Sequence, residues 1–290
     1  MSLRDALAAP ASVLWRLAAP VVPRPAGAFH VLMFHDIPSG QRESFRVLVE
    51  GLARAGRLIS PAEAEGRLAG GGPNRGLAPV LLSFDDGFAS NLAVAETVLA
   101  PLGAKALFFV CPGLIELSGE AQAEAVSRNV LRGQRAAPEP LMDWAGIERL
   151  RALGHTIGNH TRDHLRLAGL PADQRAEQIE GAAGMLAARL GAVPDWFAYT
   201  FGDIASIDAA ALAEIGRHHR YCRSGVRGAN GRGTPPLALR GDHVDLAASR
   251  DWQALACDGA LALLYGKQRR MLDGLAPTPT LPRQSRGRET

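Results

Sequence analysis

The chain has 290 residues, of which 47% are hydrophobic and 21% charged, a composition that excludes a disordered protein and allows one substantial core. The net charge of +3 comes from the C-terminal end: residues from Lys267 onward contribute +4, which leaves about −1 for the first 266 residues, so no nucleic-acid partner is expected. No apolar stretch reaches the roughly 18 residues that a membrane-spanning helix needs, so no transmembrane segment is expected.

Residues 1–28 are rich in Ala and Pro and are predicted to form an N-terminal arm or a short helix. Their apolar stretch is interrupted by Asp5, Pro10, Arg16 and Pro20, unlike the core of a secretory signal. A cytoplasmic location is therefore slightly favoured, with a periplasmic or secreted protein as the alternative.

Residues 29–270 alternate between strand and helix patterns and are predicted to form a single α/β domain. Strands are expected at 29–35, 78–86, 105–111, 195–202 and 220–224, a short element at 155–160, and helices at 43–56, 91–103, 119–133, 143–154, 172–190, 206–219 and 250–270. Such repeated units imply parallel strands with the chemistry at their carboxyl ends. Residues 271–290 are predicted to form a disordered tail rich in Pro and Arg.

The cysteines Cys111, Cys222 and Cys257 lie far apart and form no CxxC pair. Neither a disulfide framework nor a cysteine-based zinc site is expected, so we predict three core thiols.

Two acidic residues, Asp85 and Asp86, end the apolar run "VLLSF" and are followed by Gly87. Adjacent side chains that leave a strand point in different directions, so one carboxylate can bind a cation while the other faces a substrate. Taken alone, the pair could equally be a helix cap and a solvated side chain.

A second motif, "HTRDH", places His160 and His164 four residues apart, on one side of a helical turn or compact loop. Two neutral imidazoles and one carboxylate make a three-ligand site for zinc or a similar ion, and the open position is typical of a catalytic metal.

The segments "SFDDG", "HTRDH" and "WFAYTFG", in this order, resemble the polysaccharide deacetylases, the family 4 carbohydrate esterases related to nodulation-type chitooligosaccharide deacetylases. The resemblance covers roughly residues 29–245. It implies a distorted (β/α) barrel with about seven parallel strands, one divalent metal and hydrolysis of N-acetyl, or sometimes O-acetyl, groups of sugar polymers.

By matching position, the resemblance implies that Asp86, His160 and His164 bind the metal, most simply zinc with cobalt or nickel as alternatives. It makes Asp85 the general base that takes a proton from the attacking water.

The sequence departs from the family pattern where an Arg and a Pro are expected, since Ala198 and Thr200 stand there. The Arg that would orient the base is therefore missing locally, and Arg240 is a weak candidate to replace it. The backbone N–H near Phe201 is a candidate oxyanion donor, and Tyr199 is a candidate wall of the acetyl pocket.

Two further histidines are assigned to the same rim of the barrel. His243 is the candidate general acid because the adjacent Asp242 could raise its pKa, with an ordinary strand-end histidine as the alternative. His35 follows the first strand and is a candidate substrate contact, with Asp36 beside it.

Together these features predict a metal-dependent hydrolase that removes acetyl groups, most simply N-acetyl groups, from an amino-sugar polysaccharide or oligosaccharide. The expected partner is an acetylated glycan, and the oligomeric state is not predicted. Two alternatives stay open: a glycan-binding protein with impaired catalysis, and a structural component of a polysaccharide biosynthesis system.

Overall fold

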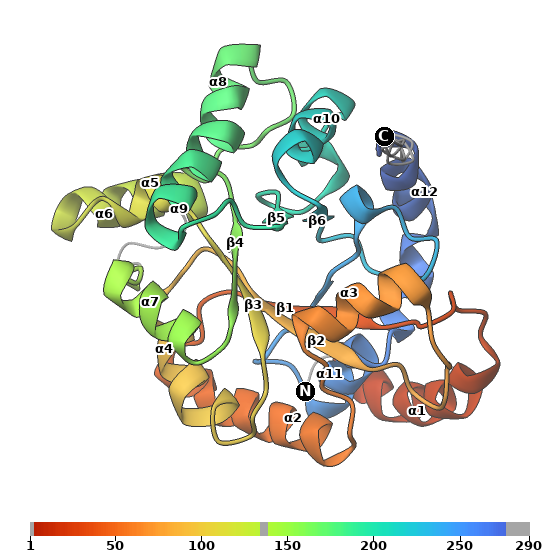
Figure 1. Ribbon diagram of the computed structural model, residues 1–290. Helices are drawn as coiled ribbons and strands as arrows, with labels where there is room; N and C mark the ends of the chain where they lie inside the picture. Colours follow the sequence, from red (N-terminus) through yellow and green to blue (C-terminus); the bar gives the residue numbers. More distant parts are fainter. Residues whose placement is uncertain (1–2, 134–138, 277–290) are drawn as a thin grey trace, which may run out of the picture.

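The computed structural model describes residues 3–133 and 139–276, and it contains one sheet of seven strands (Figure 1). The strands are β1 (His30–Phe34), β2 (Val80–Phe84), β3 (Ala106–Val110), β4 (Thr156–Asn159), β5 (Trp196–Ala198), β6 (Tyr221–Arg223) and β7 (Asp242–His243). They lie in the order β6-β5-β4-β3-β2-β1-β7, and every neighbouring pair is parallel. The prediction of a distorted (β/α) barrel with seven parallel strands is confirmed.

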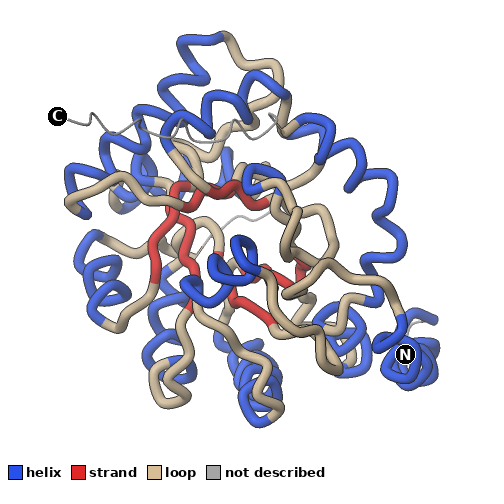
Figure 2. Tube along the Cα trace, turned by 45° about the vertical axis from the view of Figure 1, so that its right-hand side comes forward, coloured by secondary structure: helices blue, strands red, loops and turns tan. Residues whose placement is uncertain are grey.

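Helices surround the curved sheet on its outer side (Figure 2). The α-helices are α1 (Leu3–Ala18), α2 (Arg42–Arg54), α3 (Pro61–Gly70), α4 (Ala89–Val94), α5 (Pro112–Ile115), α6 (Gly119–Ala125), α7 (Trp144–Ala152), α8 (Ala172–Ala176), α9 (Ala182–Leu190), α10 (Ala209–His218), α11 (Arg250–Cys257) and α12 (Gly266–Leu275). Wider π-helical turns extend α4 through Ala95–Leu99 and α6 through Val126–Val130, and another, Glu177–Gly181, joins α8 to α9.

Both faces of the sheet are buried, as expected for parallel strands covered by helices. On the outer face, Phe84 and Phe108 stack with ring centroids 4.6 Å apart, in a cluster with Phe45 of α2. On the inner face, Phe109 and Trp196 belong to a second cluster that fills the barrel. Side chains alternate between these clusters along β1, β2 and β3, so the carboxyl ends of these strands are held in a common layer.

The C-terminal part of the chain differs from the prediction of one helix over 250–270. After α11, Gly259 takes a positive φ of 81°, and a 3-10 helix, η8 (Ala260–Tyr265), precedes α12. A Cβ on Gly259 would lie 2.5 Å from the imidazole of His30, so the chain bends there against a buried side chain.

One boundary can be compared with the predicted domain limits. Helix α12 continues to Leu275, so residues 271–275 are helical and do not belong to the predicted tail. The rest of that tail, 277–290, lies outside the described residues. The three cysteines are free and buried, which confirms the prediction of core thiols.

Candidate active site

The carboxyl ends of the strands surround one pocket with a volume of about 230 Å³. All eight residues that the sequence predicted for the site line it: His35, Asp85, Asp86, His160, His164, Tyr199, Phe201 and His243. The structure thus brings together side chains that follow β1, β2, β4, β5 and β7 or end them, while the roles assigned to them stay predictions.

Asp86, His160 and His164 offer three ligand atoms that lie within 4.8 Å of one another, and all three residues are buried. Oδ1 of Asp86 lies 3.4 Å from Nε2 of His160 and 3.2 Å from Nε2 of His164. Burial by itself would raise the pKa of Asp86, but the two imidazoles beside it, when they donate from Nε2, hold that pKa well below its usual range.

The Nδ1 atoms of the two imidazoles each have a backbone carbonyl as a hydrogen-bond partner. Nδ1 of His160 is 2.6 Å from the carbonyl of Ala198, and Nδ1 of His164 is 3.0 Å from the carbonyl of Asn129. Because a carbonyl only accepts, each Nδ1 carries a proton, and in the neutral ring, the form that binds a metal, Nε2 then has a lone pair facing Asp86.

These three groups therefore fit a cation. Two nitrogen lone pairs and a carboxylate oxygen converge, and Oδ1 of Asp86 is buried without a hydrogen-bond donor among the described residues. Three acceptors with no donor between them repel one another unless a positive ion binds, and this ligand set is one that zinc prefers.

The backbone at the site is strained. Five non-glycine residues of the described chain have positive φ, and four of them line or adjoin the pocket: Asp86, Thr161, His164 and Phe201. The fifth, Arg132, places its guanidinium 4.0 Å from the centroid of the Phe201 ring. Such strain persists only where the surroundings enforce it, and it is concentrated at functional sites.

Asp85 points toward Arg223, the last residue of β6. Nη2 of Arg223 donates to both carboxylate oxygens at 2.5 and 2.6 Å, and both side chains are almost completely buried. The guanidinium also lies 5.0 Å from the centroid of the Phe109 ring inside the barrel. The position of Asp85 is thus set by a residue 138 positions further along the chain.

Arg223 corrects the suggestion that Arg240 orients the base. Arg240 donates to Asp273 at 2.5 Å instead and does not line the pocket. Ala198, which stands where the family pattern has an Arg, contributes its backbone carbonyl to His160. The only local signal for Arg223 in the sequence is a charged residue at the end of the short segment "YCR".

Tyr199 and Phe201 form one wall of the pocket. Tyr199 is buried, and its hydroxyl donates to the carbonyl of Gly202 at 3.0 Å, while burial raises its pKa. Phe201 meets the ring of His164 edge-on, with centroids 4.8 Å apart. Thr200 donates to the carbonyl of Leu165, which ties this loop to the one that carries His164.

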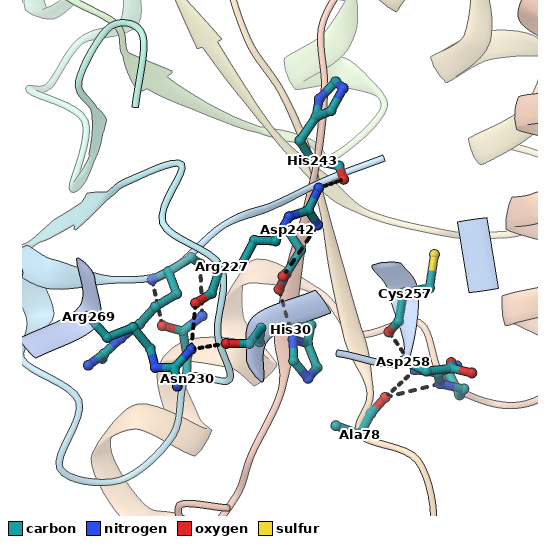
Figure 3. A network of polar contacts seen from close by, with 12 residues as sticks. His30, Ala78, Arg227, Asn230, Asp242, His243, Cys257, Asp258 and Arg269 are labelled. Carbon is teal, nitrogen blue, oxygen red and sulfur yellow. Dashed lines mark hydrogen bonds and ion pairs between the residues drawn. The ribbon is translucent and has the colours of Figure 1, made fainter. Parts of the chain in front are cut away.

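The expectation that Asp242 raises the pKa of His243 is wrong. Asp242 is directed away from the pocket, 2.8 Å from Nδ1 of His30, whereas the imidazole of His243 points to the opposite side (Figure 3). His243 is exposed at the pocket mouth, yet desolvation by the pocket wall and the positive neighbours His35 and Arg227 lower its pKa. Arg227 donates to the carbonyl of His243 at 2.6 Å and so holds β7 in place.

His35 lies where the sequence placed it. Its Nε2 is 3.8 Å from Oδ2 of Asp85, and its ring centroid is 5.7 Å from that of His243. Asp36, by contrast, accepts a hydrogen bond from Ser90.

Comparisons with known proteins identify the family of the chain. The family model for polysaccharide deacetylases matches residues 74–218, half of the chain. No curated protein sequence matches the chain.

Solved structures with a similar fold include IcaB from Ammonifex degensii, at 23% identity and a TM-score of 0.63 over 81% of this chain and 98% of that one. The deacetylase PplD of Streptococcus pyogenes, in complex with acetate, has 17% identity and a TM-score of 0.64 over 80% and 99%. The BpsB deacetylase domain from Bordetella bronchiseptica has 19% identity and a TM-score of 0.58 over 77% and 98%. At these identities the likeness concerns the fold, whereas the matched family model covers the segments that carry Asp85, Asp86, His160 and His164. The chain belongs to the polysaccharide deacetylase family of hydrolases.

Proposed function

We propose that this deacetylase depends on a divalent ion, zinc in the first place, and that it removes N-acetyl groups from an amino-sugar polysaccharide or oligosaccharide. The main support for the proposal is a buried cluster of three acceptor atoms, from Asp86, His160 and His164. It lies next to the ion pair of Asp85 and Arg223.

Asp86, His160 and His164 would hold the ion. When bound, such an ion lowers the pKa of a water molecule and polarises a carbonyl oxygen. Asp85, held in place by Arg223, accepts the proton of the attacking water. The backbone N–H near Phe201 stabilises the negative charge that develops on the acetyl oxygen, and Tyr199 shapes the space for the acetyl group.

The leaving nitrogen needs a proton, and two imidazoles lie at the pocket mouth to supply it. His243 remains our proposed acid. Because its pKa is lowered in the resting protein, it must receive a proton during the reaction. His35 is 3.8 Å from Asp85 and can pass on the proton that Asp85 has taken up.

The alternative of a catalytically impaired glycan-binding protein rested on the missing Arg and on an Asp-Trp motif of the family that is not evident in the sequence. Arg223 supplies the guanidinium from another strand, so the first of these two departures no longer favours impaired catalysis.

The experiment is acetate release by the purified protein from a panel of N- and O-acetylated oligosaccharides, after chelation and after addition of Zn²⁺ or Co²⁺. The proposal predicts release from N-acetylated amino sugars that chelation abolishes and the metal restores. Equal acetate release in the presence of the chelator would contradict metal dependence. Release from O-acetylated sugars alone would contradict the proposal that the enzyme hydrolyses N-acetyl groups.

A further inference from the structure

Most of the large apolar side chains that the described chain exposes lie in two segments, residues 7–21 and residues 263–271. Of the eleven exposed large hydrophobic residues, five lie in α1 and the turn after it, and three in η8 and α12. Clusters of exposed apolar residues mark docking sites for proteins or membranes, whereas single ones need no explanation.

Helix α1 has two apolar faces. The face against α11 is made of the small residues Ala8, Ser12 and Ala19, together with the half-buried Trp15. Leu7, Leu14 and Leu17 recur at helical spacing on another face, and Leu14 and Leu17 are 67% and 74% exposed. The leucines on this second face of α1 therefore point away from the rest of the protein.

The orientation of α1 is held by polar contacts with α11 at the edge of the molecule (Figure 1). The indole of Trp15 donates to the carbonyl of Asp258 at 2.8 Å, and Arg16 pairs with the carboxylate of Asp258. Ser12 donates to Asp251. These contacts keep Ser12 and Trp15 on the side of α11 and the leucines on the outer side of α1.

The second group of exposed apolar residues lies beside the end of α1. Trp15, Ala19 and Leu263 line one hollow of about 170 Å³. Leu264, next to Leu263, is 78% exposed, and Met271 follows one turn into α12. We call Leu7, Leu14, Leu17, Val21, Leu263 and Leu264 the apolar ridge.

The exposed charges near the apolar ridge are mainly basic. Asp258 lines the same hollow but is buried and pairs with Arg16 and Arg57, and Asp273 pairs with Arg240. Residues 6–27 contain two Arg and no acidic residue, and residues 259–272 contain one Lys, two Arg and no acidic residue. Lys267 and Arg270 are exposed and form no ion pair among the residues that the structure describes. A helix with exposed leucines beside unpaired basic residues is complementary to a bilayer with anionic headgroups.

We propose that the apolar ridge docks this deacetylase on the surface of an anionic phospholipid bilayer, with the leucines of α1 in the acyl boundary and Lys267 and Arg270 at the headgroups. The contact is peripheral and does not use the pocket.

The test is flotation of the full chain with phosphatidylglycerol vesicles and with phosphatidylcholine vesicles. We expect binding to the anionic vesicles that needs at least tenfold more lipid in the Leu14→Gln/Leu17→Gln variant. The matched control, Leu102→Gln/Leu117→Gln, changes two other exposed leucines and should bind like the parent protein. All three proteins should release acetate at the same rate from a soluble substrate, since the changed side chains are exposed and lie outside the pocket.

A second pair of variants tests the charge. Lys267→Gln/Arg270→Gln should weaken binding to phosphatidylglycerol about tenfold, whereas Arg54→Gln/Arg217→Gln removes the same charge elsewhere and should not. Equal binding to both lipids, no binding, or binding unchanged by Leu14→Gln/Leu17→Gln would overturn the proposal. Dimers that this variant dissociates, without vesicle binding, would assign the apolar ridge to a second copy of the chain and overturn it as well.

Discussion

Asp85 and Arg223 form an ion pair that is almost completely buried, and both residues line the pocket. Nη2 of Arg223 is shared between both oxygens of Asp85, and the ring of Phe109 faces the guanidinium. Removal of one partner of such a pair leaves an uncompensated buried charge, which costs about 3–5 kcal/mol. The pair therefore matters for stability as well as for the position of the base.

We predict that Arg223→Gln lowers kcat about 100-fold while the metal content stays that of the parent, because the base loses its orientation and the ligands do not. It should also lower the free energy of unfolding by about 3–5 kcal/mol. Acetate release, metal analysis and denaturant unfolding measure the three effects.

Arg240→Gln is the matched control, because Arg240 pairs with Asp273 away from the pocket. Its kcat should stay within about twofold of the parent. Loss of turnover in Arg240→Gln with normal turnover in Arg223→Gln would reverse the assignment.

At the scale of residues, the sequence predicted those site residues that a short motif marks. Asp85 and Asp86 adjoin a strand, and His160 and His164 share one short motif, so their meeting follows from the order of parallel strands. Arg223 was missed because its partner is 138 residues away, and the pairing becomes visible only once β6 and β2 curve around the same barrel. The direction of Asp242 was missed for a similar reason, since His30 lies in a different strand.

The loops after β5 and β6 touch through their backbones. The N–H of Gly225 donates to the carbonyl of Gly202 at 2.8 Å, and a Cβ on Gly202 would lie 2.7 Å from that nitrogen. Gly202 also has a φ of 71°, and it follows Phe201 in the pocket wall. This close contact fixes the loop that carries the proposed oxyanion donor.

We expect Gly202→Ala to lower the free energy of unfolding through both backbone strain and a steric clash, and to reduce kcat because the Phe201 loop must move. Gly169→Ala is the comparison, since Gly169 has a similar φ of 77° with open space around it. Strain alone should cost Gly169→Ala about 1–2 kcal/mol. The clash should add about 1–3 kcal/mol in Gly202→Ala.

Thermal or denaturant unfolding of the two variants, with acetate release measured alongside, separates the effects. If both variants lose the same stability and keep the same kcat, the contact between the two loops does not shape the pocket.

At the scale of elements, the alternation of apolar runs and amphipathic segments predicted the strands β1 to β6 and most helices, but not the two-residue strand β7. It failed in the last part of the chain, where one helix was expected over 250–270. The pattern of apolar residues continues through η8, but the close approach of Gly259 to His30 bends the chain, and that contact is between distant segments.

At the scale of the whole molecule, His155 and His219 are buried outside the pocket, and their surroundings favour the neutral imidazole. Nδ1 of His219 is 2.7 Å from the carbonyl of Pro194, and its Nε2 is 3.2 Å from the side-chain nitrogen of Asn159, so the ring donates at one side and accepts at the other. Burial lowers the pKa of His219 to about 4, and likewise that of His155 to about 4.

The free energy of unfolding should therefore fall as the pH drops from 6.5 toward 4. The pKa of His219 is lower in the folded than in the unfolded state, so its contribution is complete above pH 6.5 and is lost as the pH approaches 4. For one such histidine the loss between pH 7 and pH 5 is about 2 kcal/mol.

Denaturant unfolding at pH 7 and pH 5 measures this loss in the parent and in His219→Gln, where the difference between the two pH values should shrink. His218→Gln changes the neighbouring histidine, which is only partly buried, and should keep the difference of the parent. An unchanged difference in His219→Gln would show that other groups cause the acid sensitivity.

The most direct test of the account compares Asp85→Asn with Asp86→Asn, two identical changes at adjacent positions, by metal content and acetate release in the same preparations. The account predicts that Asp85→Asn retains one equivalent of zinc and releases no measurable acetate, whereas Asp86→Asn loses the zinc and the activity together. Zinc retained by Asp86→Asn, or acetate released by Asp85→Asn at the rate of the parent protein, would contradict the division of roles between the two carboxylates.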